Sequence, residues 1–389
     1  MQKSKRPCKI RDYNDIRDAQ LGAKNRGEKW PFRIFSPLLY QLSYPANLRR
    51  EHITPGHCRT ARVKAKNPPW KRLNGLKPMS WSRAKKHQRL AAAKTGDSNI
   101  AFDSQEGAKH APGVRISIVT PSYRRSAWLK LCITSVADQR VEVEHIVQDA
   151  ESDDGTLDWL PGDRRVKMFA EKDQGMYDGI NRGLRRAGGD ILAYLNCDEQ
   201  YLPGALTAVA GFFEQHPQMD VLFGDVVMVD TDGRYLYHRK MQMPLKYHTW
   251  TCHLSTLSCA MFFRRRVISD YGLLFDPRLR DVGDGEWMIR LLQRRVRMAA
   301  LGQFTSVFTC TGANMSIGPN ARRENRELFL SAPFWARAIK PLFILQHRLR
   351  RWASGVYRQE PFAYEIFTLA SPDRRQRYEV SRPTFRAPR

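Results

Sequence analysis

Residues 189–199 read Gly-Asp-Ile-Leu-Ala-Tyr-Leu-Asn-Cys-Asp-Glu. The apolar part, Ile191 to Leu195, predicts a short buried strand that ends in a polar cluster containing Asp198 and Glu199. Open α/β sheets bind ligands beyond the carboxyl ends of their strands. The stretch therefore predicts either a ligand or metal site on these two carboxylates or a solvated acidic loop, and the surrounding sequence decides between the two.

Three further strands are predicted before this one, at 114–120, 143–149 and 166–170. A helix beginning near Ser126 follows the first of them, and a helix over 176–187 follows the third and stops at Gly188-Gly189. Strand, helix and strand in succession favour a parallel sheet with right-handed crossovers. We therefore predict an α/β fold in which four strand ends bring polar side chains to one edge: Thr120, Asp149, either Glu171 or Asp173, and Asp198.

The chain after residue 199 also contains predicted helices and strands. It predicts a helix with Pro203 near its first position, a strand over 219–223, a hairpin over 226–237 that turns at Asp232-Gly233, and an apolar strand over 260–263. A further helix is predicted to begin in the acidic segment 281–287, where the helix dipole favours negative charge.

Charge divides the chain of 389 residues unevenly. Residues 1–110 carry 25 Lys and Arg against 8 Asp and Glu, so most of the net charge of +26 lies there. We interpret 1–110 as a basic, flexible extension, 111–320 as the α/β domain and 321–389 as a basic helical region. Seven scattered cysteines without a Cys-x-x-Cys pair, and no long apolar run, favour a cytoplasmic protein.

The tail over 334–357 alternates aromatic residues with Arg and Lys. This pattern is typical of an amphipathic helix on an anionic membrane surface, interrupted early by Pro341. A helix packed on the domain with a solvated basic face would give the same pattern, so both interpretations stay open.

The sequence lacks two common nucleotide-binding motifs. Neither Gly-x-x-x-x-Gly-Lys-Ser/Thr nor Gly-x-Gly-x-x-Gly occurs, so neither a P-loop nor a dinucleotide fold is supported. A bound diphosphate would instead be held through side chains and a divalent cation on one or two carboxylates.

Three segments carry a family resemblance. They are Ile-Val-Thr-Pro-Ser-Tyr over 118–123, His-Ile-Val-Gln-Asp over 145–149 with Ser-Asp-Asp-Gly-Thr over 152–156, and Glu-Lys-Asp-Gln-Gly-Met-Tyr-Asp-Gly-Ile-Asn-Arg-Gly over 171–183. Together with the stretch 189–199, they resemble family 2 glycosyltransferases with the GT-A fold, including bacterial enzymes of the colanic-acid and exopolysaccharide type. The resemblance covers residues 114 to about 318.

The resemblance implies roles for individual residues. Thr120, Tyr123 and Asp149 would contact the base and ribose of the nucleotide, and Asp173 and Asn181 would shape the same pocket. Asp198 would hold Mn²⁺ or Mg²⁺. Two positions depart from the family pattern, Cys197 in place of Ser and Glu199 in place of a second Asp.

The segment Gly-Asp-Gly-Glu-Trp over 283–287 resembles the family segment that contains the catalytic base. We assign this role to Asp284, with Glu286 as the alternative, whereas capping of the helix by both acids is the simpler interpretation. His253 falls where relatives place a histidine before a strand, so it is a candidate for contact with the acceptor or the diphosphate, or a structural residue.

The implied activity is metal-dependent, inverting transfer from a nucleotide-sugar, expected to be a UDP-sugar, to a hydroxyl of a saccharide or lipid-linked acceptor. We expect it in surface polysaccharide biosynthesis, with the enzyme peripheral on the inner face of the cell membrane. The alternative is a nucleic-acid-binding protein that uses residues 1–110 beside an inactive α/β scaffold. The strand-end acids would repel a phosphate backbone, so no specific nucleic-acid partner is expected.

Overall fold

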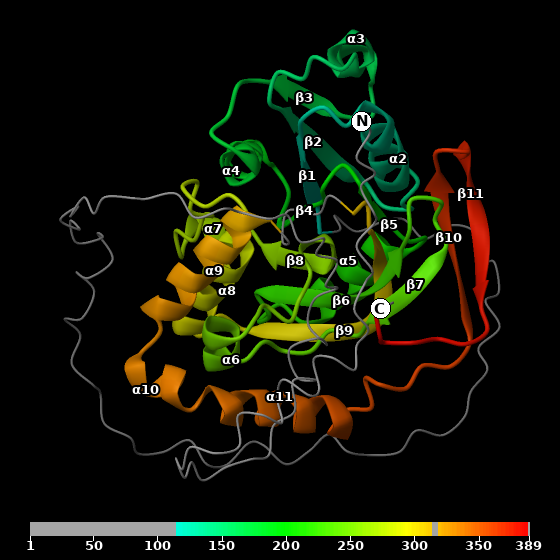
Figure 1. The fold of residues 1–389 in the computed structure, drawn as a ribbon. Coiled ribbons are helices and arrows are strands. Elements are labelled where there is room, and N and C mark those ends of the chain that lie inside the picture. Colours follow the sequence, from blue (N-terminus) through cyan, green and yellow to red (C-terminus); the bar gives the residue numbers. More distant parts are fainter. Residues whose placement is uncertain (1–113, 313–317, 388–389) are drawn as a thin grey trace, which may run out of the picture. The chain divides into compact units, whose positions relative to one another are not determined.

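The computed structural model describes residues 114–312 and 318–387, and within them nine strands form one mixed sheet (Figure 1). The predicted α/β class is therefore confirmed. The expectations for the basic extension over 1–110 lie outside the described residues. Among the helices of the described ranges, none is long and apolar enough to cross a membrane.

The first half of the sheet is the predicted parallel quartet, in the order β3-β2-β1-β4. Every residue of β1 is buried, as expected for a strand that helices cover on both faces. The register places Ser122 of β1 beside Asp149 of β2, so these two strand ends meet at one edge. The strands are β1 (Ile116–Ser122), β2 (Val143–Asp149), β3 (Lys167–Ala170) and β4 (Ile191–Tyr194).

Helices cover both faces of this quartet. α2 (Ser126–Ala137) and α4 (Met176–Arg186) lie on opposite sides of it, and the short α3 (Thr156–Trp159) follows β2 (Figure 1). A Cβ atom on Gly183 of α4 would lie only 2.3 Å from Cγ1 of Val119, so glycine permits the close approach of α4 to β1.

The second half of the sheet adds antiparallel pairs. β8 (Met261–Arg264) joins β4 to β6 (Val221–Val229), which runs parallel to β9 (Met298–Thr309). β5 (Glu199–Tyr201) pairs with β9, and β7 (Tyr235–Arg239) pairs with β6 through the predicted turn at Asp232-Gly233. The helices of this half are α5 (Ala205–Gln215), α6 (Lys246–Thr251), α7 (Arg266–Ser269) and α8 (Gly283–Gln293).

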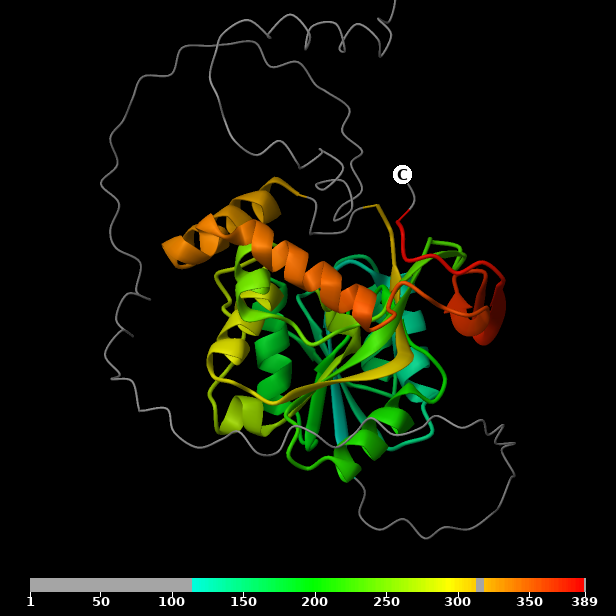
Figure 2. The same cartoon turned by 90° about the horizontal axis from the view of Figure 1, so that it is seen from below.

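The C-terminal region combines helices with a hairpin. α9 (Pro319–Ser331), α10 (Phe334–Ala338) and α11 (Lys340–Ala353) precede β10 (Phe362–Thr368) and β11 (Ser371–Val380). Pro341 lies in the first turn of α11, where proline is tolerated, and the break falls at Ile339. Seen from below, α11 lies across the outside of the domain (Figure 2). The sequence did not predict the hairpin, whose Tyr364 and Ile366 pack against Val227 and Val307.

A buried carboxylate on α9 fixes the start of α8. Glu324, 3% exposed, accepts hydrogen bonds from the backbone N–H groups of Arg280 (2.9 Å), Asp281 (3.0 Å) and Val282 (3.2 Å). Burial alone would raise the pKa of Glu324, but these bonds and one from Asn320 outweigh it, so the pKa lies below its usual range. The backbone that leads into the acidic helix start is thereby held to α9.

We predict that Glu324→Gln lowers the free energy of unfolding by about 2 kcal/mol at pH 7, because hydrogen bonds to a charged group are lost. The folded-state pKa is lowered, so the contribution of the carboxylate is present above its unfolded pKa of about 4.3 and is lost as the pH falls through the lower folded value. Urea unfolding of variant and parent at several pH values measures both effects.

The matched control is Glu327→Gln, since Glu327 is an exposed residue of the same helix. This variant should unfold like the parent at every pH. A Glu324→Gln protein with a constant deficit down to pH 3 would contradict the assigned role of the ionised carboxylate.

Candidate active site

Three acidic residues from two distant parts of the chain influence one another at the end of β4. Asp198 and Glu199 follow this strand directly, and Asp284 lies in the first turn of α8. Burial raises the pKa of Glu199 to about 8, and the charges of Asp198 and, more weakly, Asp284 act in the same direction. The fold thus brings the predicted catalytic helix start to the strand-end carboxylates.

The oxygen atoms at this edge suit a divalent cation. Glu199 Oε2 accepts a hydrogen bond from the backbone N–H of Asn196 (2.8 Å). Glu199 Oε1 and Asn196 Oδ1 are buried and have no hydrogen-bond partner in the described part of the chain. Burial also raises the pKa of Asp198, against the weak opposing effect of Arg125. Buried oxygen acceptors without donors are costly alone, and oxygen atoms are the ligands that Mn²⁺ and Mg²⁺ prefer.

The two acids of α8 differ in their partners. Glu286 forms a two-pronged ion pair with Arg290, with N–O distances of 2.7 and 2.8 Å. Asp284 Oδ1 accepts from the backbone N–H of Gly285 (2.8 Å) and, at 3.4 Å, from the hydroxyl of Tyr177. Burial raises the pKa of Asp284, and the bonds from Gly285 and Tyr177 only partly offset this. A carboxylate with a raised pKa and only neutral donors can accept a proton more readily than one neutralised by arginine.

Tyr177 connects Asp284 to a stack of aromatic rings. The hydroxyl of Tyr177 also accepts from the backbone N–H of Asp284 (3.1 Å), and the Tyr177 ring stacks on Phe275, with centroids 5.5 Å apart. Phe275 stacks in turn on Trp287 at 4.7 Å. The sequence analysis gave Tyr177 no role, although it lies within the motif over 171–183.

Asn181 fixes this stack in place. Its side-chain amide donates to the carbonyl oxygen of Phe275 (2.8 Å) and accepts from the backbone N–H of the same residue (2.9 Å). The residue is 2% exposed. Its side chain therefore ties α4 to the segment before α8.

The residues predicted at the donor pocket fall into two groups. Thr120 and Asp149 are fully buried and bonded within the protein, since Thr120 Oγ1 lies 2.9 Å from Nε2 of His145 and Asp149 accepts from the N–H and hydroxyl of Ser152 (2.7 and 2.8 Å). Tyr123 is 52% exposed at the end of β1. The structure thus places the ring of Tyr123 where a ligand can reach it and uses Thr120 and Asp149 to order the strand ends.

Asp173 lies partly exposed at the start of α4. Its Oδ1 accepts from the backbone N–H of Gly175 (2.9 Å), and burial together with the charge of Asp178 raises its pKa. A Cβ atom on Gly179 would lie 2.8 Å from Asp173 Oδ2, so the glycine leaves room for this carboxylate.

His253 lies in different surroundings from the carboxylates. Its ring packs against His248 and His347, with centroids 4.6 and 5.8 Å apart. The charges that act on it most strongly belong to Arg239, Arg351 and Lys340.

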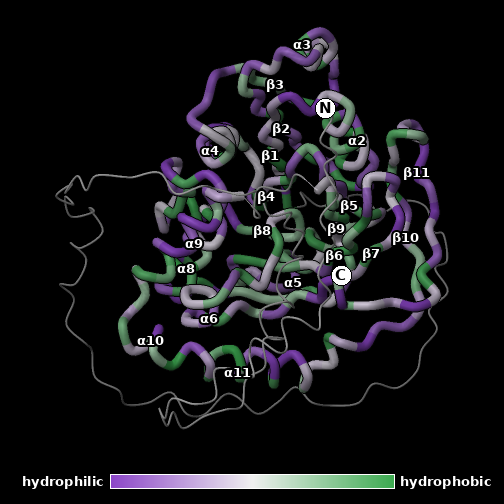
Figure 3. The backbone as a smooth tube through the Cα atoms, in the orientation of Figure 1, coloured by the Kyte–Doolittle hydropathy of each residue, from purple (hydrophilic) through white to green (hydrophobic). Residues whose placement is uncertain are grey.

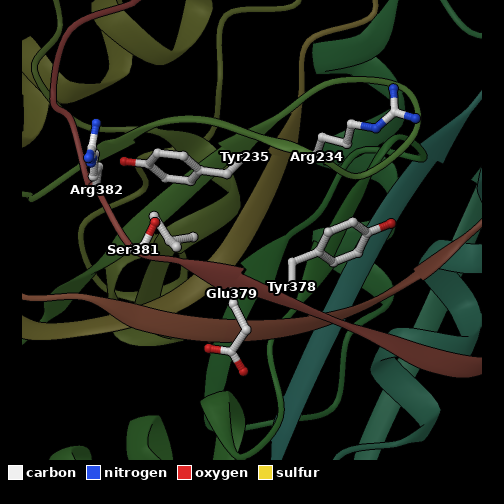
Figure 4. A pocket seen from close by; sticks show the side chains of 7 residues that line it. Arg234, Tyr235, Tyr378, Glu379, Ser381 and Arg382 are labelled. Carbon is white, nitrogen blue, oxygen red and sulfur yellow. The ribbon is translucent and has the colours of Figure 1, made fainter.

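A hollow of about 340 Å³ lies between the β6–β7 turn and β11 (Figure 4). Arg234, Tyr235, Tyr378 and Glu379 contribute to its wall, and Figure 4 shows these side chains on facing segments. The candidate residues described above belong to other segments, so we assign this hollow no part in the site.

Comparison with known proteins shows which family these features belong to. The family model described as glycosyl transferase family 2 matches residues 117–272. A PGL/p-HBAD biosynthesis glycosyltransferase of Mycobacterium bovis is 32% identical over 181 residues, which cover 45% of this chain and 68% of the relative. A GalNAc(5)-diNAcBac-PP-undecaprenol beta-1,3-glucosyltransferase of Campylobacter jejuni is 30% identical over 102 residues, covering 24% of this chain and 33% of that protein.

Among solved structures, S. aureus TarS 1-349 in complex with UDP-GlcNAc has a TM-score of 0.46 and 18% sequence identity, covering 61% of this chain and 73% of that one. The match to the family model, the extent of the mycobacterial relationship and the α/β sheet agree with the expected GT-A fold class. The chain therefore belongs to glycosyl transferase family 2, and it is a glycosyltransferase.

Proposed function

We propose that the enzyme transfers a sugar, with inversion, from a nucleotide-diphosphate donor to a hydroxyl group of a saccharide or lipid-linked acceptor. The observation that carries the proposal is that Asp284, in the first turn of α8, and Asp198, after β4, both act by their charges on Glu199, because this reaction needs a base beside a cation site. One relative, a PGL/p-HBAD biosynthesis glycosyltransferase, and another, a GalNAc(5)-diNAcBac-PP-undecaprenol beta-1,3-glucosyltransferase, support an acceptor of this class. We expect a UDP-sugar donor and a role in surface polysaccharide biosynthesis.

The donor would lie across the ends of β1, β2 and β4. We assign contact with the nucleotide to Tyr123 and Asp173, whose side chains reach the surface, and to the strand end that contains Asp149. Thr120 and Asn181 act as positioning residues in this proposal, since their polar groups are bonded to His145 and to Phe275.

Asp198 would hold the divalent cation, and Glu199 Oε1 and Asn196 Oδ1 supply further oxygen atoms beside it. When bound, Mn²⁺ or Mg²⁺ would supply Lewis-acid stabilisation of the negative charge on the departing diphosphate.

Asp284 would remove the proton from the acceptor hydroxyl as its oxygen forms the new bond to the anomeric carbon. Tyr177 and the first turn of α8 orient the carboxylate, and Glu324 anchors the preceding backbone. Partial burial favours the proton-accepting role, because it raises the pKa of Asp284 towards that of the hydroxyl it must deprotonate.

We predict that UDP with Mn²⁺ raises the melting temperature of the full chain by a few degrees at about 100 times its dissociation constant, equivalent to roughly 2.7 kcal/mol. GDP and dTDP are tested beside it to identify the base. Asp198→Ala should abolish the Mn²⁺-dependent part of the shift. Asp270→Ala, which removes an exposed carboxylate after α7, should retain it, whereas equal shifts in parent and Asp198→Ala would contradict the cation site.

We predict that Asp284→Asn lowers the transfer rate by about 10²–10⁴-fold, because a positioned general base contributes that much. Nucleotide binding should stay within about two-fold of the parent. Release of UDP from a panel of UDP-sugars, with membrane lipid extract as the acceptor source, measures the rate. Glu286→Gln is the matched control, and a larger loss of rate in this variant would move the base from Asp284 to Glu286.

The C-terminal helices support the membrane interpretation of the tail. Four residues at helical spacing face outward on α11: Leu342, Leu345, Leu349 and Trp352, which are 51–75% exposed. Phe334 of α10 is 78% exposed, and Figure 3 shows apolar segments along both helices. Partly buried basic residues flank the outward stripe: Arg337, Lys340, Arg348, Arg350 and Arg351. An apolar stripe beside basic side chains fits the interface of an anionic membrane.

We predict that the full chain sediments with vesicles containing about 30% anionic lipid, and that Leu345→Glu with Leu349→Glu weakens this binding at least 10-fold, because burial of each leucine contributes about 1.5–3 kcal/mol. Leu369→Glu alters an equally exposed leucine in the β10–β11 turn and should bind like the parent. Unchanged sedimentation of the double variant would contradict attachment through α11. Nucleic-acid binding, if it accompanies the basic extension, should be unaffected by either change.

A further inference from the structure

Three histidines from separate segments lie together where α11 contacts α6. They are His248 of α6, His253 of the following loop and His347 of α11, and a nitrogen atom from each lies within 4.8 Å of those of the other two. The rings of His248 and His347 are stacked with centroids 4.1 Å apart, while the ring of His253 meets both edge to face. His248 and His347 are 1% and 8% exposed.

Two of the ring nitrogens lack protein partners. His248 Nδ1 and His347 Nε2 are buried and have no hydrogen-bond partner in the described part of the chain. A buried polar atom without a partner is costly, and such atoms are usually satisfied by protein, water or an ion. Both unpartnered atoms belong to residues of the cluster, so an ion bound by these rings would satisfy such atoms.

We propose that His248, His253 and His347 bind Zn²⁺. Imidazole nitrogen is a preferred zinc ligand, and three histidines leave one coordination position for water, hydroxide or another anion. This site goes beyond the proposed cation site at Asp198, which is built from oxygen atoms, and it does not depend on the proposed transfer reaction.

The protonation state of the cluster suits metal binding. Burial is the main cause that lowers the pKa of His248 to about 2 and those of His253 and His347 to about 4, and the neighbouring histidines and basic residues act in the same direction. Neutral imidazole is the form that binds zinc.

The basic residues around the three histidines affect which ligands the site can hold. Arg350 and Arg351 lie near the rings and oppose the approach of a divalent cation. An anionic fourth ligand would offset part of this repulsion. The site is therefore expected to bind zinc together with hydroxide or a small anion.

Zinc at this position would fasten α11 to the transferase domain. α6 contacts both α8 and α11, and the ring of Tyr247 in α6 packs on Phe343 of α11 with centroids 5.6 Å apart. A metal shared by α6, its following loop and α11 would add coordination bonds to this apolar contact.

The test is zinc titration of the tag-free full chain, metal-stripped with a chelator, in competition with a chromophoric zinc chelator. The parent should bind one Zn²⁺ more per chain than His347→Gln or His253→Gln. Each substitution should weaken that site at least 100-fold, since loss of even a hydrogen-bond partner of a zinc ligand costs about 10–100-fold. Bound Co²⁺ should give the visible absorption of a tetrahedral site in the parent, and this absorption should be lost in His347→Gln and His253→Gln.

His216→Gln is the matched control, because His216 packs on Phe212 outside the cluster. This variant should bind zinc like the parent. His253 is the most exposed of the three, so His253→Gln provides a folded variant, checked by circular dichroism, even where His347→Gln is unstable. Equal zinc stoichiometry and affinity in the parent, His253→Gln and the control would overturn the proposal.

Discussion

The burial of negative charge at the end of β4 is the constraint on which the rest of the structure depends. Burial raises the pKa of Asp198, Glu199 and Asp284, and the charges of Asp198 and Asp284 raise that of Glu199 further. Burial of ionised carboxylates is unfavourable, so these positions require a scaffold that stays in place at an electrostatic cost, and such strain is characteristic of functional sites.

Polar side chains around the site hold the backbone near α8 in place, and they do not neutralise the charge of the buried carboxylates. Glu324 accepts hydrogen bonds from the backbone N–H groups before α8. Asn181 forms hydrogen bonds with both the N–H and the carbonyl group of Phe275. Tyr177 bridges the two parts through its stacked ring and its hydroxyl. Each of these bonds joins segments that are distant in sequence. The first turn of α8 is therefore held against the sheet from two sides, and Asp284 remains without a basic partner.

The local pattern of the sequence was sufficient for the parallel quartet and its helices. β2 matches the predicted segment 143–149, and α4 ends one residue before its predicted limit, because buried strands and amphipathic helices carry strong periodic signals. The three-residue β5 and the β10–β11 hairpin were missed, since β5 is too short for any period and β11 is rich in exposed arginine. Periodicity predicts long elements but not which distant elements come into contact. The roles assigned to Asp284 and Asp198 came from the family resemblance, and the contact of His347 with His248 had no signal in the sequence.

The same packing connects α11 to α8, the helix that carries Asp284. α6 lies against α8 on one side and α11 on the other, so a displacement of α11 would act on the helix that carries Asp284 through a single intervening element. His248 and His347 lie at the α6–α11 contact, and Trp250 of α6 donates to the hydroxyl of Ser331 at the end of α9. Catalysis by a general base depends on its position to a fraction of an ångström. In the proposed function, the contacts of α6 with α8 and α11 would therefore link the outward face of α11 to the position of Asp284.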